Sequence, residues 1–120
     1  MRHLRVNLND VANWLRSLPQ ETQFNMNTND QCLFACYLQT VYSTKTISVG
    51  TDRATLDGER YALDPAASRI IWELWDYELP DEAWIVSRDE ALSAVEKSLH
   101  LRERYRQYAQ AANQRRMHVS

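Results

Sequence analysis

Cys32 and Cys36 are the residues in this chain most able to do chemistry together, and they are its only cysteines. Their i, i+4 spacing would place both thiols on one face of a helix. They could supply half of a metal site, but C-x-x-C spacing is absent, and His3, His100 and His118 are scattered. A disulfide across one helical turn has poor geometry. We interpret the pair as buried core thiols and expect no metal and no cofactor.

The sequence carries none of the common catalytic patterns. It has no G-x-S-x-G, H-E-x-x-H, Gly-rich phosphate loop or EF-hand pattern, and it contains two glycines in all. Carboxylates are dense in residues 73–82, but acid–base work needs a desolvated cleft that separates their pKa values. No pattern in the sequence indicates such a cleft. We therefore expect the protein not to be an enzyme.

The segment IIWELWDYELPDEAW, residues 70–84, interleaves aromatic bulk with acidic charge and contains no basic residue. At 100° per residue, Ile70, Ile71 and Leu74 face the core of a helix, and Trp72 falls on the opposite, charged side. Either the last helix or the loop at 79–84 covers Trp72, or a partner does. We hypothesise a partner-binding surface, because Trp is enriched at binding hot spots. Its predicted members are Trp72, Glu73, Trp75, Asp76, Asp81 and Glu82.

Charge is distributed unevenly along the chain. Residues 99–120 carry five Arg and one Glu, a balance of +4, whereas residues 1–98 carry nine Lys or Arg and fifteen Asp or Glu, a balance of −6; together they give the net charge of −2. In the last predicted helix, the apolar residues Ala91, Leu92, Val95 and Leu99 form a stripe that would dock on the body. The basic end that follows also carries aromatic bulk, because Leu101, Tyr105, Tyr108 and Ala112 lie to one side of this stripe. We predict a second partner-binding group here, made of Arg102, Tyr105, Arg106 and Tyr108.

The elements that would position these residues follow from changes in hydrophobic period. A 3.6-residue period predicts a helix after an Asn7 or Asn9 cap, and a second over about 29–43 opened by a Thr28–Gln31 capping box. A period of two predicts a hairpin turning at Asp57-Gly58. A third helix is expected over about 65–78 and a long last helix from Ser87 to about 112. Short strands are candidates at 4–8, 24–26, 46–50 and 83–86. This order predicts an α+β fold, a small antiparallel sheet packed against about four helices.

Length and composition favour one soluble domain. The 120 residues can form a hydrophobic core, and 44% hydrophobic with 25% charged residues is ordinary for a globular protein. No stretch approaches the roughly 20 apolar residues of a bilayer-spanning helix, and no secretory signal follows Met1. We expect a cytoplasmic protein of one domain over residues 1–120, with residues 100–120 as a projecting or frayed basic helical tail.

These features favour a small non-catalytic interaction or regulatory protein of the inhibitor or adaptor type. Small inhibitors carried by phages and mobile elements, anti-CRISPR proteins among them, are analogous in size and charge, although no motif links this chain to them. The expected partner is a protein, including a nucleic-acid-binding protein or complex, or a second copy held through the last helix. The alternative is a nucleic-acid-binding accessory protein that uses the basic C-terminal helix. The acidic body argues against that alternative because it would repel a polyanion.

Overall fold

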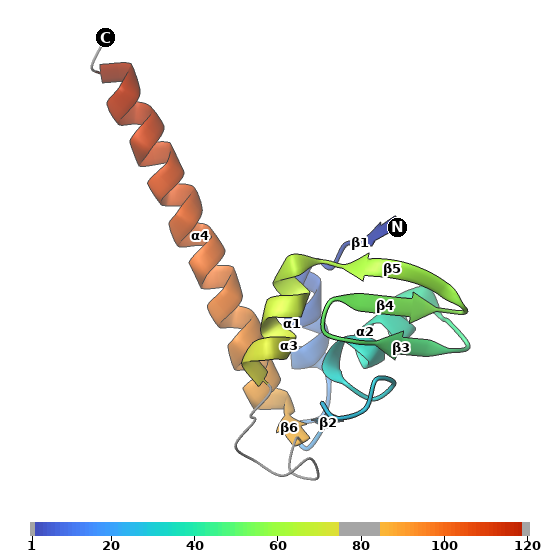
Figure 1. Ribbon diagram of the computed structural model, residues 1–120. Coiled ribbons are helices and arrows are strands. Elements are labelled where there is room, and N and C mark those ends of the chain that lie inside the picture. Colours follow the sequence, from blue (N-terminus) through green and yellow to red (C-terminus); the bar gives the residue numbers. More distant parts are fainter. Residues whose placement is uncertain (1, 75–84, 119–120) are drawn as a thin grey trace.

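Figure 1 shows a computed structural model in which a mixed α+β body carries one long helix that extends beyond it. The structure describes residues 2–74 and 85–118, with side chains through residue 114. Its helices are α1 (Leu8–Ser17), α2 (Leu33–Tyr42), α3 (Pro65–Leu74) and α4 (Arg88–His118). Its strands are β1 (Arg2–Leu4), β2 (Gln23–Asn25), β3 (Ile47–Val49), β4 (Arg53–Leu56), β5 (Glu59–Leu63) and β6 (Ile85–Ser87). The predicted α+β class with a hairpin and a long C-terminal helix is confirmed.

The larger sheet has the strand order β1-β5-β4-β3. β3, β4 and β5 pair antiparallel, as the hairpin pattern predicted, but β1 pairs with β5 in parallel, with Leu4 opposite Leu63. The sheet is therefore mixed. The predicted strand at 4–8 lies earlier in the chain, at Arg2–Leu4. Three residues are too few for an alternation pattern to show which strand they will join.

The Asp57-Gly58 hairpin is confirmed. Asp57 has φ +48° and Gly58 has φ +86°, the left-handed pair that a two-residue type I′ turn requires. The carboxylate of Asp57 also accepts hydrogen bonds from the backbone N–H groups of Lys45 and Thr46, at 2.9 and 2.8 Å. The turn thus holds the chain that leads into β3 as well as its own two strands.

A second, two-stranded sheet joins β2 to β6 antiparallel, with Phe24 opposite Val86. Both of these side chains are buried. Each strand was expected from the sequence within about two residues of its observed position, although residues 83 and 84 lie outside the described part of the chain. This pairing brings the start of α4 next to the segment that follows α1.

Of the two candidate caps for α1, Asn7 and Asn9, Asn7 is the one that forms, whereas the cap predicted for α2 does not form. The side chain of Asn7 accepts from the N–H groups of Asn9 and Asp10 at 3.0 and 3.2 Å. α2 begins at Leu33 rather than near residue 29, so the Thr28–Gln31 capping box does not form. The Thr28 hydroxyl instead donates to the backbone carbonyl of Asn25 at 3.2 Å. Short side chains of this kind compete for local backbone groups and favour turns over helix starts.

α3 is anchored at its beginning by Asp64. One carboxylate oxygen accepts from the Ala66 N–H at 3.0 Å, and the other accepts from the Val6 N–H at 3.2 Å. Asp64 therefore caps α3 and ties it to the segment that follows β1. The helix was predicted to reach residue 78; it is described to Leu74, and residues 75–78 lie outside the described range.

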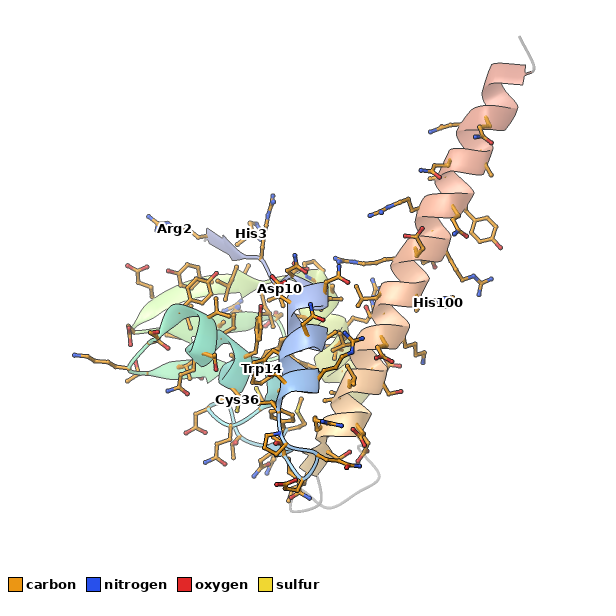
Figure 2. All side chains as sticks on the ribbon, turned by 180° about the vertical axis from the view of Figure 1, so that it is seen from behind. Arg2, His3, Asp10, Trp14, Cys36 and His100 are labelled. Atoms are coloured by element: carbon orange, nitrogen blue, oxygen red, sulfur yellow. The ribbon has the colours of Figure 1, made fainter. Side chains whose placement is uncertain are left out.

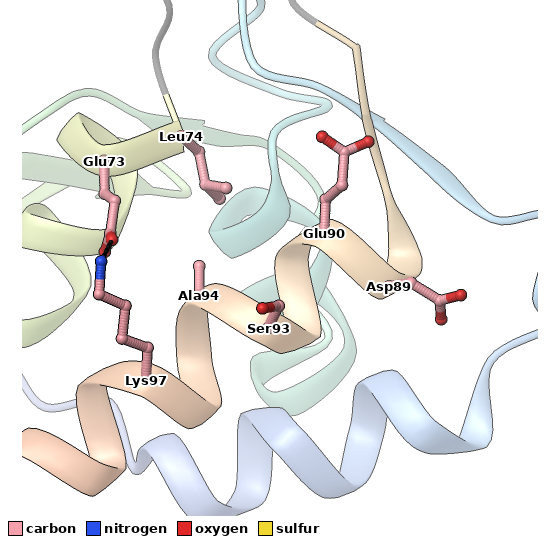
Figure 3. A pocket seen from close by; sticks show the side chains of 7 residues that line it. All are labelled: Glu73, Leu74, Asp89, Glu90, Ser93, Ala94 and Lys97. Carbon is pink, nitrogen blue, oxygen red and sulfur yellow. Dashed lines mark hydrogen bonds and ion pairs between the residues drawn. The ribbon is translucent and has the colours of Figure 1, made fainter.

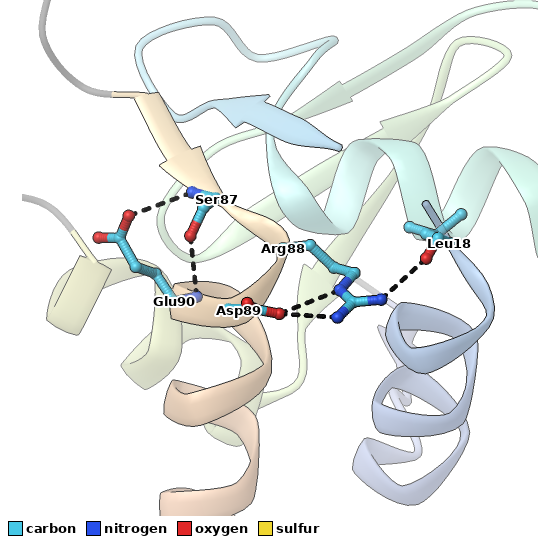
Figure 4. Close-up of polar contacts among 5 residues, drawn as sticks. All are labelled: Leu18, Ser87, Arg88, Asp89 and Glu90. Atoms are coloured by element: carbon cyan, nitrogen blue, oxygen red, sulfur yellow. Dashed lines mark hydrogen bonds and ion pairs between the residues drawn. The ribbon is translucent and has the colours of Figure 1, made fainter. Parts of the chain in front are cut away.

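α4 opens with the predicted Ser87–Glu90 capping box, drawn in Figure 4. The Glu90 N–H donates to the Ser87 hydroxyl at 3.1 Å, and the Ser87 N–H donates to the Glu90 carboxylate at 3.3 Å. Arg88 donates to the backbone carbonyl of Leu18 at 3.0 Å, which attaches the helix start to the end of α1. The helix runs to His118 instead of about 112, because neither Gly nor Pro interrupts it and Ala, Gln and Arg are good helix formers.

The core lies where α1, α2, α3 and the first half of α4 meet the sheet. Phe34, Leu38, Ile70 and Val95 are among its fully buried side chains. Trp14 packs on this core with its ring 5.8 Å from that of Phe24 and 5.5 Å from that of Tyr37. The predicted docking stripe of α4 is largely confirmed, with Ala91 and Val95 buried and Leu92 and Leu99 packed at the margin.

Candidate functional site

The two cysteines lie at the start of α2. Cys32 is buried immediately before the helix, and burial raises the pKa of its thiol to about 11. Cys36, labelled in Figure 2, is half-buried on the first turn, and its pKa is raised by burial and then by Asp30. Both thiols are therefore protonated at neutral pH, which makes them weak nucleophiles and weak metal ligands. Within the described residues, no three His, Cys, Asp or Glu side chains gather as a candidate metal site.

The exposed side of α3 is oriented as the sequence predicted. Ile70 and Ile71 are buried, whereas Trp72 is 47% exposed. Leu74, expected in the core, is only partly buried at its margin. Glu73 accepts a hydrogen bond from the Lys97 ammonium of α4 at 2.7 Å. The other predicted members of this surface, Trp75, Asp76, Asp81 and Glu82, lie outside the described residues.

An open groove of about 510 Å³ lies between the end of α3 and the start of α4. Figure 3 shows Glu73 and Lys97 meeting across it, with Leu74 and Ala94 directed into the space between the helices. The sequence did not single out the α4 side of this groove, because no local pattern shows which face of α3 will oppose it. Its lining residues are Glu73, Leu74, Asp89, Glu90, Ser93, Ala94 and Lys97.

The second half of α4 carries the largest exposed apolar side chains of the helix. We call residues 101–118 the projecting half; Figures 1 and 2 show it extending away from the body. Every residue from 101 to 114 is exposed. Leu101 is 37% exposed, Tyr105 70% and Tyr108 66%. Because these three residues are spaced by four and then three positions, they share one face, and we call them the Leu–Tyr stripe.

Basic residues flank the stripe without forming a single basic face. Arg102 and Arg106 are four residues apart and lie on the same side, whereas Arg104 lies on another side of the helix. Arg106 forms a long ion pair of 3.7 Å with Glu103, and both side chains are mostly exposed. Exposed pairs of this kind contribute little to stability. Among the described side chains, the arginines of the projecting half are thus spread around it, while the aromatic side chains are aligned.

The structure joins some predicted site residues and separates others. Tyr105 and Tyr108 line one shallow groove of about 230 Å³ with Leu101 and Arg104. Arg102 and Tyr105 line another that reaches the start of α3. Glu73 belongs to the separate groove at the other end of α3. Sequence reasoning missed the α3 side of the second groove, whose residues are Asp64, Pro65, Ala66 and Arg69.

Comparison with protein-family models, with curated proteins and with solved structures finds no match to this chain. The class of protein is therefore defined by its architecture, an α+β body with a long C-terminal helix. None of the helices that the structure describes combines the length and the apolarity that a bilayer crossing needs.

Proposed function

We propose that this protein is a small non-catalytic interaction protein, of the inhibitor or adaptor type, that binds a protein partner through the Leu–Tyr stripe of α4. One observation carries the proposal: two tyrosines and a leucine are aligned and exposed on the half of α4 that extends past the body. Tyrosine is among the side chains most enriched at binding hot spots, since it offers a large apolar ring and a hydroxyl group.

The arrangement favours a protein partner over a nucleic acid. A phosphate backbone is bound by clustered cations, and the arginines of the projecting half point to different sides, as their spacing shows. One of them, Arg106, is also paired with Glu103. The aligned surface is the aromatic one. A partner helix or groove that accepts side chains at i, i+4 and i+7 matches that spacing.

Affinity capture from a native lysate with three versions of the full chain tests the proposal. The first is the wild type, and the second is Tyr105→Arg/Tyr108→Arg, which removes the stripe. The third is Gln107→Arg/Gln110→Arg, a matched control that adds two charges to a different face of the same helix. We expect proteins that the wild type and the control retain and that the stripe variant loses.

The same three versions distinguish the alternative function. Binding to a generic oligonucleotide is measured by fluorescence anisotropy at several salt concentrations. We expect no salt-dependent binding by the wild type. Binding that weakens steeply with salt and strengthens in both arginine variants would instead support a nucleic-acid-binding accessory protein. Captured proteins that do not change among the three versions would contradict the proposed role of the stripe.

A further inference from the structure

We infer that the partner of the Leu–Tyr stripe is a second copy of this chain, paired antiparallel through the projecting halves of α4. The inference deepens the proposed function and rests on the stripe being a binding surface. The apolar spacing of α4 continues without a break across the edge of the body. Ala91, Ala94 and Ser98 are buried, and the same alternation of three and four residues continues through Leu101, Tyr105, Tyr108 and Ala112. Such spacing is the seam of a coiled coil.

Side-chain size along the seam favours the antiparallel direction. The half of the seam near the body carries Leu101 and Tyr105, and the distal half carries Tyr108 and Ala112, flanked by Ala109 and Ala111. With the two-fold axis between residues 106 and 107, Leu101 lies opposite Ala112 of the second copy. Tyr105 then lies opposite the other copy's Tyr108. Large and small side chains therefore interdigitate, whereas a parallel pair would place alanines against alanines and leave space unfilled.

Charge along the seam favours the same direction. Arg102 and Arg104 flank the seam near the body, and residues 107–114 carry no charge. In the antiparallel register, Arg102 lies beside Ala109 of the second copy and Arg104 lies beside its Ala111. A parallel pair would instead bring Arg102 close to Lys97 of the second copy. Like charges placed together in this way destabilise an interface.

The shape of the molecule permits this pairing. The 18 residues of the projecting half span about 27 Å, and the protein measures 57 × 31 × 30 Å along its principal axes. Antiparallel copies therefore place their bodies at opposite ends of the helix pair. In a parallel pair, both bodies would lie at the same end of the helix pair. Each body is about as wide as the projecting half is long, so the two would clash.

The interface would be small. Pairing covers Tyr105 and Tyr108 of both copies, and these side chains are 66–70% exposed in the single chain. The four rings together bury on the order of 400–700 Å². Leu101, the alanines and the arginine stems add to this, so the total approaches the roughly 1,000 Å² of a specific interface. The dimer is therefore expected to be reversible and to depend on protein concentration.

Sedimentation velocity of the full chain over a wide concentration range is the first test. The wild type should shift from monomer to dimer as concentration rises. Tyr105→Arg/Tyr108→Arg should weaken the dimer at least about 100-fold, because two hot-spot side chains are lost and four cations are brought together. Gln107→Arg/Gln110→Arg should still dimerise. Circular dichroism checks that all three versions keep the same fold and melting temperature.

Spin labels measure the direction of pairing. Gln107→Cys and Gln114→Cys are seven residues apart and occupy the same position of the repeat, so their lateral geometry is matched. Each is labelled in a Cys36→Ser background, where buried Cys32 reacts slowly. In the antiparallel dimer, the distance between labels at 114 includes an axial separation of about 22 Å, compared with about 1.5 Å at 107. A parallel dimer gives equal distances at both positions.

The outcomes separate this inference from the proposed function. A wild type that stays monomeric at every concentration overturns self-pairing, and so does a dimer that survives the stripe variant. Equal label distances overturn the antiparallel arrangement. If the chain is monomeric while captured proteins still depend on the stripe, the proposed function stands with a different protein as the partner. If neither measurement depends on the stripe, both the inference and the proposed function fail.

Discussion

The two halves of α4 have the same apolar spacing but opposite surroundings. In the first half, residues 88–100, Ala91 and Val95 are fully buried against the body. In the projecting half, Tyr105 and Tyr108 are about two-thirds exposed. A single regular helix passes from one environment to the other without a Gly or Pro. Apolar periodicity thus shows which face of a helix will be covered, but it does not show what will cover it.

Polar contacts differ between the two halves as well. The first half is tied to α1 and α3 by three contacts: Arg88 donates to Leu18, Glu96 pairs with Arg16 at 3.0 Å, and Lys97 pairs with Glu73 at 2.7 Å. In the projecting half, the ion pair between Arg106 and Glu103 joins two residues of the helix itself. The first half is therefore part of the folded core, and the projecting half is available to a partner.

The largest effect is expected from a charge placed in the first half. Val95→Asp would bury an unpaired carboxylate in the core, and the free energy of unfolding should fall by about 3–5 kcal/mol. Tyr105→Asp, the matched change in the projecting half, should cost less than about 1 kcal/mol, mostly through helix propensity. Urea unfolding followed by circular dichroism measures both. Equal losses for the two variants would show that the projecting half belongs to the core.

The second effect concerns alkaline pH and the buried thiol of the body. The pKa of Cys32 is about 11 in the folded state, against 9.0 as its ordinary value. Because the folded pKa is the higher one, its contribution to stability is complete below pH 9 and is lost as pH rises towards 11. The loss should be on the order of 2–3 kcal/mol. Unfolding titrations at a series of pH values should show it in the wild type, and Cys32→Ala should show a correspondingly smaller decline.

Removing the projecting half should have a small effect on stability. A chain ending at His100 should still unfold cooperatively, with a loss below about 1 kcal/mol, because the removed side chains through residue 114 are exposed. Helical circular dichroism should decrease in proportion to the residues removed, and binding through the stripe should disappear. A truncated chain without a cooperative transition would mean that the contact of Leu101 and Arg102 with the start of α3 is essential to the fold.

The smallest effect is expected from the ion pair between α3 and α4. Lys97→Ala should reduce the free energy of unfolding by about 0.2–1 kcal/mol, since both side chains are partly exposed and water screens the pair. The difference between variant and wild type should shrink as salt is added. Glu73→Gln is the matching control and should lose a similar amount. A loss of several kcal/mol would indicate that this contact, rather than apolar burial, holds the two helices together.

Local patterns predicted much of the fold. The Asn7 cap, the Ser87–Glu90 capping box and the Asp57-Gly58 turn each depend on residues within four positions of one another, and all three form as expected. The Thr28–Gln31 capping box failed although its spacing was equally good, because Thr28 bonds to Asn25 instead. A local motif is reliable only where no neighbouring backbone group competes for the same side chain.

The candidate site was predicted in part. Trp72 was expected on an outward face from its angular position, and Tyr105 and Tyr108 were expected on a projecting helix end; all three are exposed. The two grooves that contain Glu73 and Tyr105 were not predicted, because each has walls from α3 and α4. Neither helix contains a pattern that identifies the opposing residues of the other.

The sequence by itself determined the order of the helices and the hairpin along the chain, which face of each helix is apolar, and that the C-terminal helix is basic and aromatic. These properties depend on spacing within a few residues, and they are set before the chain folds. The tertiary structure alone decided that β1 joins β5 in parallel, that Glu73 meets Lys97, and that the body ends near residue 100 of α4. These depend on contacts between residues distant in the sequence, where many pairings satisfy the same local pattern and packing selects one.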